Sequence, residues 1–205
     1  MVSRTRRDST YVEEYLTASA EILARLDRAS IAAVVDELAD LRDRGGRLFL
    51  VGSGGGAGHA SHAVCDFRKL AGFEAYTPTD NVSELTARIN DEGWASSYAN
   101  WLRTSRFGDR DLLFVFSVGG GDADRKISTN LVQCMDLARE VGARVCGIVG
   151  RDGGHTLEAA DACVVVPTVE GAGVTAQTES FQALIWHLLV SHPSIQQAPM
   201  KWESV

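Results

Sequence analysis

The apolar residues of this chain alternate between short continuous runs and longer segments with a helical period. Four runs of four or five residues, at 48–51, 112–116, 145–149 and 163–166, are rich in Leu, Val, Ile and Phe. These runs and a shorter one at 73–76 predict strands, and the segments between them predict helices. Such alternation is typical of an α/β fold, a doubly wound, mostly parallel sheet flanked by helices.

Two helices are expected before the first strand. Apolar positions recur with helical spacing over 10–26 and again over 31–41, where Ser30 is a plausible N-cap and Gly45-Gly46 a stop signal. A single βαβ unit needs no such pair. We expect the two helices to form a hairpin whose exposed face packs on another subunit.

Later helices are expected over 81–89, 91–106, 125–141 and 178–190. In the second of these, Trp94, Tyr98 and Trp101 recur at helical spacing, which predicts packing in the core or in an interface. With 205 residues, the chain is long enough for one full α/β domain. We therefore expect a single domain over 1–205. Leading helices occupy about 10–44, the sheet core about 47–190 and a tail 191–205.

Charge and cysteine usage exclude several classes of protein. The formal net charge of −7 and the scattered Lys and Arg residues argue against a nucleic-acid surface. The four cysteines stand singly, without a metal-type pair or a disulfide pattern, so we expect small buried thiols in a reducing compartment. No apolar run is long enough for a membrane span or a signal peptide. A cytoplasmic protein is expected.

Three glycine-rich turns follow predicted strands: a first glycine loop at 52–58, a second at 117–122 and a third at 150–154. Because parallel strands end at one edge of a sheet, these loops are expected to face one crevice. Glycines followed by a helix N-terminus suit a phosphate group. A dinucleotide site is a weaker interpretation, because the second strand lacks a well-placed acidic residue at its end.

Four side chains are candidates for chemistry. His62 and Asp66 stand four apart on one helix face, as half a metal site or as a hydrogen-bonded pair in the crevice wall. Glu179 and His187 lie in an otherwise apolar terminal helix, where His187 could also be a satisfied core histidine. Eight residues of helix separate the last two by about 12 Å. Either Glu179 precedes the regular helix and folds back, or a neighbouring subunit supplies one of the two.

The order of these motifs resembles one enzyme family. The chain is similar to phosphoheptose isomerases, which are sugar isomerase (SIS) domain enzymes, in the following features taken in order: two leading helices, a G-S-G-G-G turn followed by His62 and Asp66, the pair Asn90-Asp91, a loop opened by Ser117, the G-R-D-G-G stretch at 150–154, and a final helix with His187. The similarity spans about 11–190, nearly the whole chain.

The resemblance implies an aldose–ketose isomerase that converts sedoheptulose 7-phosphate to glycero-manno-heptose 7-phosphate through an enediol. It implies that Asp66 and His187 transfer the protons and that zinc, or another divalent metal, is held by His62, Asp66, Glu179 and His187. It also implies a homotetramer with sites at subunit interfaces. The implied substrate contacts are Ser53, Gly54, Gly55, His62, Asn90, Asp91, Ser117, Val118, Gly119, Asp122 and Glu179.

Several positions depart from the family pattern. Gly56 stands where the family has a Ser, and the second glycine loop retains only Ser117 of the family's hydroxyls. Asp122 puts a carboxylate where a hydroxyl would meet phosphate, which would repel a dianion unless the side chain is protonated or turned away. Asp66 replaces Glu and Glu179 replaces Gln. A non-catalytic SIS module that binds a sugar phosphate or a protein, and an isomerase of a modified heptose in secondary metabolism, are the alternatives.

Overall fold

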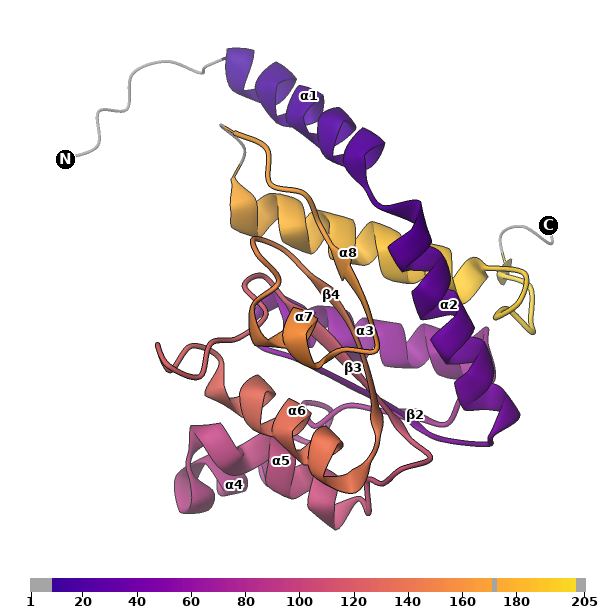
Figure 1. Ribbon diagram of the computed structural model, residues 1–205, viewed down its shortest axis with the longest axis vertical. Helices are drawn as coiled ribbons and strands as arrows, with labels where there is room; N and C mark the ends of the chain where they lie inside the picture. The colour runs from indigo at the N-terminus through magenta and orange to yellow at the C-terminus, as the bar shows by residue number, and fades with distance from the viewer. Residues whose placement is uncertain (1–8, 171–172, 202–205) are drawn as a thin grey trace.

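A five-stranded parallel sheet forms the centre of the computed structural model, which describes residues 9–170 and 173–201 (Figure 1). The strands stand in the order β2-β1-β3-β4-β5, and every neighbouring pair is parallel. Their bounds are β1 Leu48–Gly52, β2 Ala75–Tyr76, β3 Leu112–Ser117, β4 Arg144–Val149 and β5 Ala162–Val165. The predicted α/β sheet is confirmed.

Helices cover both faces of this sheet. Their bounds are α1 Ser9–Arg25, α2 Arg28–Asp43, α3 Gly55–Lys69, α4 Val82–Glu92, α5 Trp94–Thr104, α6 Thr129–Val141, α7 Gly154–Ala159 and α8 Val174–Ser191. Helices α2, α3 and α8 pack on one face, and α5 and α6 pack on the other. Among these described helices, none has the length and apolar character that a bilayer span requires.

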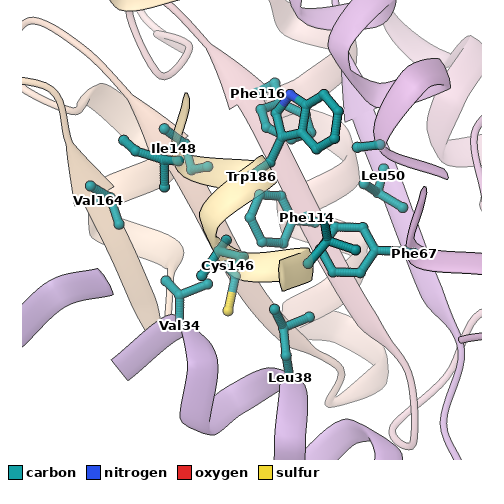
Figure 2. Packing of buried hydrophobic residues seen from close by; sticks show 14 of the residues in the cluster. Val34, Leu38, Leu50, Phe67, Phe114, Phe116, Cys146, Ile148, Val164 and Trp186 are labelled. Carbon is teal, nitrogen blue, oxygen red and sulfur yellow. The ribbon is translucent and has the colours of Figure 1, made fainter. Parts of the chain in front are cut away.

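The strand side chains divide between two apolar clusters, as the alternation along a strand requires. Leu50 and Phe114 point towards α2, α3 and α8, where they meet Val34, Phe67 and the fully buried Trp186 (Figure 2). Their neighbours along the strands point to the opposite cluster, which contains Tyr98 and Leu102 of α5 and several residues of α6. Tyr98 is therefore a core residue, as its spacing predicts, whereas Trp94 is 43% exposed.

The two leading helices are present, but they do not form the predicted hairpin. Figure 1 shows α2 continuing away from α1, and α1 lies beside α8, where the Ser19 hydroxyl donates to Gln177 Oε1 at 3.0 Å. The N-cap of α2 is Asp27, whose carboxylate accepts the Ala29 N–H at 2.9 Å, so the prediction of Ser30 is wrong. Asp27 directly precedes the first residue of α2, and a carboxylate caps a helix as well as a hydroxyl does.

Three local predictions need correction. Helix α6 begins at Thr129 rather than near position 125, because an antiparallel bridge between Asp122 and Ile127 closes a turn there. The short α7 follows the third glycine loop and was not expected from so brief an apolar pattern. Cys65 is exposed, although Cys134 and Cys146 are buried as expected.

The start of α3 lies unusually close to the ends of β1 and β3. A β-carbon on Gly52 would lie 2.3 Å from the backbone of Gly56, and one on Gly56 would lie 2.6 Å from the Phe116 carbonyl oxygen. Only residues without side chains allow this approach. The helix consequently begins at Gly55, inside the stretch predicted to be a loop, and the family's Ser has no room at position 56.

We expect Gly56→Ala to destabilise the fold by about 1–3 kcal/mol, because its β-carbon would press against backbone that cannot move aside. Gly58→Ala is the matched control in the same helix, since a β-carbon there meets nothing within 4 Å. That control should stabilise the protein by about 0.5–1 kcal/mol through helix propensity. Chemical denaturation of both variants measures the difference, and equal free energies of unfolding would contradict the close approach.

Candidate active site

The three glycine loops lie at the carboxyl edge of the sheet, where the strand order reverses. Strand β2 pairs with one side of β1 and β3 with the other, so the direction of winding changes between β1 and β3. Ligands of open parallel sheets bind beyond the strand ends at such a point. The first and second glycine loops follow these two strands, so both border the expected crevice.

The second and third glycine loops are locked together. The Gly150 N–H donates to the Val118 carbonyl at 3.1 Å, and the Thr156 hydroxyl donates to the Gly120 carbonyl at 2.7 Å. Gly120 and Gly121 have φ values of 72° and 83°, which glycine adopts without strain. Two of the three glycine loops therefore lie together, and the prediction that all three face one crevice stays a prediction.

His62, Asp66 and His187 form a cluster two to three helical turns along α3 and α8 from the glycine loops. The Nε2 atoms of His62 and His187 lie 3.8 and 3.9 Å from Oδ2 of Asp66. One ligand-type atom from each residue lies within 4.8 Å of the others. Asp66 is the most buried of the three, with 17% of its side chain exposed, and both imidazoles remain open to solvent. Helix α3 supplies two members and α8 supplies the third.

Packing and a hydrogen bond orient the imidazole of His187. Its ring lies on the indole of Trp186, with centroids 3.5 Å apart, and the edge of the same indole meets His62 at 4.8 Å. His187 Nδ1 lies 2.7 Å from the Ala183 carbonyl oxygen. A carbonyl can only accept, so Nδ1 carries the proton and Nε2 of the neutral ring has a lone pair facing Asp66.

Glu179 lies apart from this cluster, on the first glycine loop. A β-carbon on Gly55 would lie 2.4 Å from the Glu179 carboxylate, so that carboxylate covers the first residue of α3. Both Glu179 and His187 lie inside the continuous α8, so the interpretation that Glu179 precedes the regular helix is wrong. The structure thus brings together three of the four predicted ligands within one chain.

The charge of Glu179 also acts on His59, a residue to which the sequence assigned no role. Burial lowers the pKa of His59, and the nearby Glu179 carboxylate opposes that shift. The positive end of α3 and its first turn therefore carry a carboxylate and a half-buried imidazole. The signal available in the sequence was the position of His59, one helical turn before His62.

The predicted contact residues of the two loops are held by internal hydrogen bonds. Asn130 Nδ2 donates to the Ser53 hydroxyl at 3.1 Å, and the buried Ser117 Oγ accepts the Gly120 N–H at 3.0 Å. Gly54, Gly55, Val118 and Gly119 line the same edge. Asn130 is completely buried and joins the first loop to α6, a link that no spacing in the sequence indicated.

The remaining predicted contacts lie elsewhere. Asn90 and Asp91 are exposed on α4, where Asn90 Nδ2 donates to Asp91 Oδ1 at 2.7 Å. Helix α4 packs on α5, on the face of the sheet opposite α3 and α8. The Asp122 carboxylate accepts the Arg125 N–H at 2.8 Å and so closes its own turn. The structure does not bring these three residues to the His62 cluster.

Tyr98 is another residue to which the sequence assigned no role at the site. Its hydroxyl donates to the Gly52 carbonyl at 3.1 Å, beneath the first glycine loop. Burial raises the pKa of Tyr98 to about 12, so the phenol stays protonated and keeps donating. The sequence signal was present, but it indicated a core aromatic residue rather than a support for the loop.

Comparison with known sequences decides the family. The SIS domain profile matches residues 11–150, well over half of the chain. The chain belongs to the SIS domain family. Among proteins similar to this SIS domain, the lincomycin biosynthesis protein LmbN of Streptomyces lincolnensis is 32% identical over 192 residues, which cover 88% of this chain and 68% of LmbN.

Phosphoheptose isomerases are also similar to this SIS domain. That of Geotalea daltonii is 34% identical over 143 residues, covering 67% of this chain and 70% of the relative. The structure of phosphoheptose isomerase GmhA from Neisseria gonorrhoeae superposes with a TM-score of 0.75 at 23% identity, covering 90% of this chain and 95% of that one. The resemblance recognised in the sequence is confirmed, and the superposition establishes the fold.

The hydrogen bonds of two histidines predict opposite neutral tautomers. Neutral His187 should be protonated on Nδ1, which faces a carbonyl, whereas neutral His192 should be protonated on Nε2, because its Nδ1 accepts the Ser194 N–H at 3.2 Å. Long-range ¹H–¹⁵N spectra at alkaline pH, assigned with His187→Ala and His192→Ala, distinguish the two. The same tautomer at both positions would contradict the orientation of His187.

Proposed function

We propose that this SIS domain is a sugar-phosphate aldose–ketose isomerase, and that sedoheptulose 7-phosphate is its substrate. The observation that carries the proposal is the cluster of His62, Asp66 and His187 between α3 and α8. The names of the phosphoheptose isomerases among the relatives support the same reaction. We further propose that the whole chain, 1–205, is one SIS unit.

The reaction moves a proton between C1 and C2 of the sugar through an enediol. Asp66 is the proposed base, because its carboxylate is the most buried group of the cluster and lies 3.8 and 3.9 Å from the Nε2 atoms of His62 and His187. In the metal-free site, His187 is proposed to exchange the second proton through Nε2, whose lone pair is available in the neutral ring. With a metal bound, that lone pair would be a ligand instead. The first glycine loop, about two turns before His62 on α3, is proposed to hold the sugar with backbone amides.

The cluster also fits a divalent metal. Two imidazole nitrogens and a carboxylate oxygen are the usual donors of catalytic zinc, and a zinc with bonds of about 2.0–2.2 Å needs its ligand atoms somewhat over 3 Å apart. The observed 3.8 and 3.9 Å separations are close to that requirement. We propose that His62, Asp66 and His187 hold zinc, which would polarise the sugar oxygens and so favour proton loss from carbon.

Glu179 is proposed to complete the metal site across a subunit interface. Its position on α8 is about 12 Å along the helix from His187, which is too far for both to bind one ion within a chain. Exposed apolar side chains of α1 and α8, including Leu16, Leu23, Leu184 and Leu188, support an oligomer. We propose the homotetramer that the resemblance implies.

A second candidate function is the isomerisation of a modified sugar phosphate in secondary metabolism. LmbN, the relative that covers 88% of this chain, bears the name of a lincomycin biosynthesis protein. The second glycine loop, which lacks the hydroxyls expected of the family, is compatible with such a change of substrate. Both candidates use the same His62, Asp66 and His187 cluster.

Purified protein should convert sedoheptulose 7-phosphate to an aldose. His187→Ala should lower kcat by about 10²–10⁴-fold, the usual range for loss of a proton-transferring group. His192→Ala is the matched control, since His192 lies beyond α8 and outside the cluster. Coupled detection of the aldose measures both rates. Folded protein that gives no product with or without zinc would disprove this substrate, and full activity of His187→Ala would remove that residue from the mechanism.

Zinc should bind the wild-type protein and lose affinity when a cluster residue is removed. We expect His62→Ala to weaken zinc binding by at least about tenfold. Removing a residue that only hydrogen-bonds to a metal ligand lowers metal affinity by about 10–100-fold, and loss of a ligand itself should cost no less. His155→Ala is a control on a different helix, α7. Competition with a chromogenic chelator gives the affinities. Equal affinity of both variants and the wild type would contradict the site.

A further inference from the structure

Arg151 of the third glycine loop is a cation without a partner among the residues that the structure describes. It has a φ of 54°, a backbone conformation that is costly for a residue with a β-carbon. Its side chain extends over the second glycine loop, where a β-carbon on Gly119 would lie 3.7 Å from Arg151 Cδ. The aliphatic stem of this exposed arginine therefore lies over Gly119, at the carboxyl edge of the sheet.

The surface beneath Arg151 offers a further donor, and the nearby acids Asp122, Asp124 and Asp152 line one hollow. The Gly119 N–H has no acceptor in the described part of the chain. The Asp122 carboxylate, which could repel an anion, is committed to the Arg125 N–H and pairs with the Arg125 side chain at 3.5 Å. The hollow that it lines with Asp124 and Asp152 does not include Gly119 or Arg151. An anion is therefore favoured on the Gly119 side of the loop and disfavoured in the hollow.

The other place for an anion, the N-terminus of α3, is already covered by a carboxylate. Glu179 lies against Gly55, the first residue of that helix. A phosphate dianion placed there would meet a like charge at close range, which disfavours binding. The first glycine loop keeps the shape of a phosphate site but carries its own negative charge.

We infer that Arg151 and the backbone of the second glycine loop bind the phosphate group of the substrate, in place of the loop hydroxyls that this chain lacks. A guanidinium presents a fork of donors that matches two phosphate oxygens, so one arginine can replace several hydroxyls. The identity of the sugar rests on the proposed function, whereas the binding of a phosphate group by Arg151 does not depend on it.

The dimensions of α8 fit a long sugar phosphate between Arg151 and the cluster. A β-carbon on Gly150 would lie 2.3 Å from Thr178 Oγ1, so the third loop rests on α8 at that point. From Thr178 to His187 the helix axis advances about 13 Å. An extended seven-carbon chain with its phosphate ester measures about 10 Å, given bonds of about 1.5 Å. The flexible arginine side chain can cover the remaining distance.

The test compares Arg151→Gln and Arg151→Lys with Arg103→Gln. Arg103 is a matched exposed arginine at the end of α5, where it pairs with Glu140 at 3.5 Å. Arg151→Gln should raise KM for sedoheptulose 7-phosphate by about 10–100-fold, the range of a charged hydrogen bond, with little change in kcat. Arg151→Lys should recover part of the loss, and affinity for unphosphorylated sedoheptulose should not change.

A second readout is independent of turnover: titration of the wild type and each variant with inorganic phosphate at low ionic strength by calorimetry. Weaker phosphate binding in Arg151→Gln but not in Arg103→Gln supports the assignment, even if no sugar is converted and the proposed reaction fails. Unchanged KM and unchanged phosphate affinity in Arg151→Gln overturn it and leave the isomerase proposal intact. Absence of phosphate binding to the wild type also overturns it. Thermal unfolding confirms that each variant is folded.

Discussion

The contact of α3 with the ends of β1 and β3 is the constraint on which the rest of the site depends. Gly52 and Gly56 have no side chains, so the first turn of the helix rests directly on the Phe116 carbonyl. This contact fixes the axis of α3 relative to the sheet. His62 and Asp66, two and three turns further along, then face α8 at the height of His187. Any side chain at position 56 would displace the helix and separate the cluster.

Much of the fold was predictable because its signals are local. The strand runs are short, continuous and apolar, and the helices between them have clear periods, so the parallel sheet and nearly all the helices could be placed from the sequence. The exceptions are positions where two signals compete. Asp27 and Ser30 can both cap a helix, and the Gly52–Gly58 stretch could be a loop or a helix start until the packing of Gly56 on Phe116 is known.

The site was only partly predictable because its geometry depends on contacts between distant segments. The spacing of His62 and Asp66 placed them on one face of a helix, but the meeting with His187 depends on how α8 lies beside α3. No spacing reveals that Asn130 holds Ser53, that Ser117 holds Gly120, or that Asp122 closes its own turn. Each of these polar residues could have faced a ligand. Their actual partners are set by loop conformations that the sequence does not encode locally.

Helix α8 determines how the charges of the site are divided. Because it is continuous from Val174 to Ser191, it holds the Glu179 carboxylate at the start of α3 and His187 beside Asp66, with a separation that the helix rise fixes at about 12 Å. The N-terminus of α3 would otherwise attract an anion, but the Glu179 carboxylate beside it disfavours a phosphate there. The guanidinium of Arg151 restores positive charge beyond it, on the neighbouring loop. If both proposed ends bind one substrate, a three-carbon sugar phosphate is too short to reach the cluster and Arg151 together. Selection for chain length then follows from the rigidity of one helix, without any side chain that contacts the middle of the sugar.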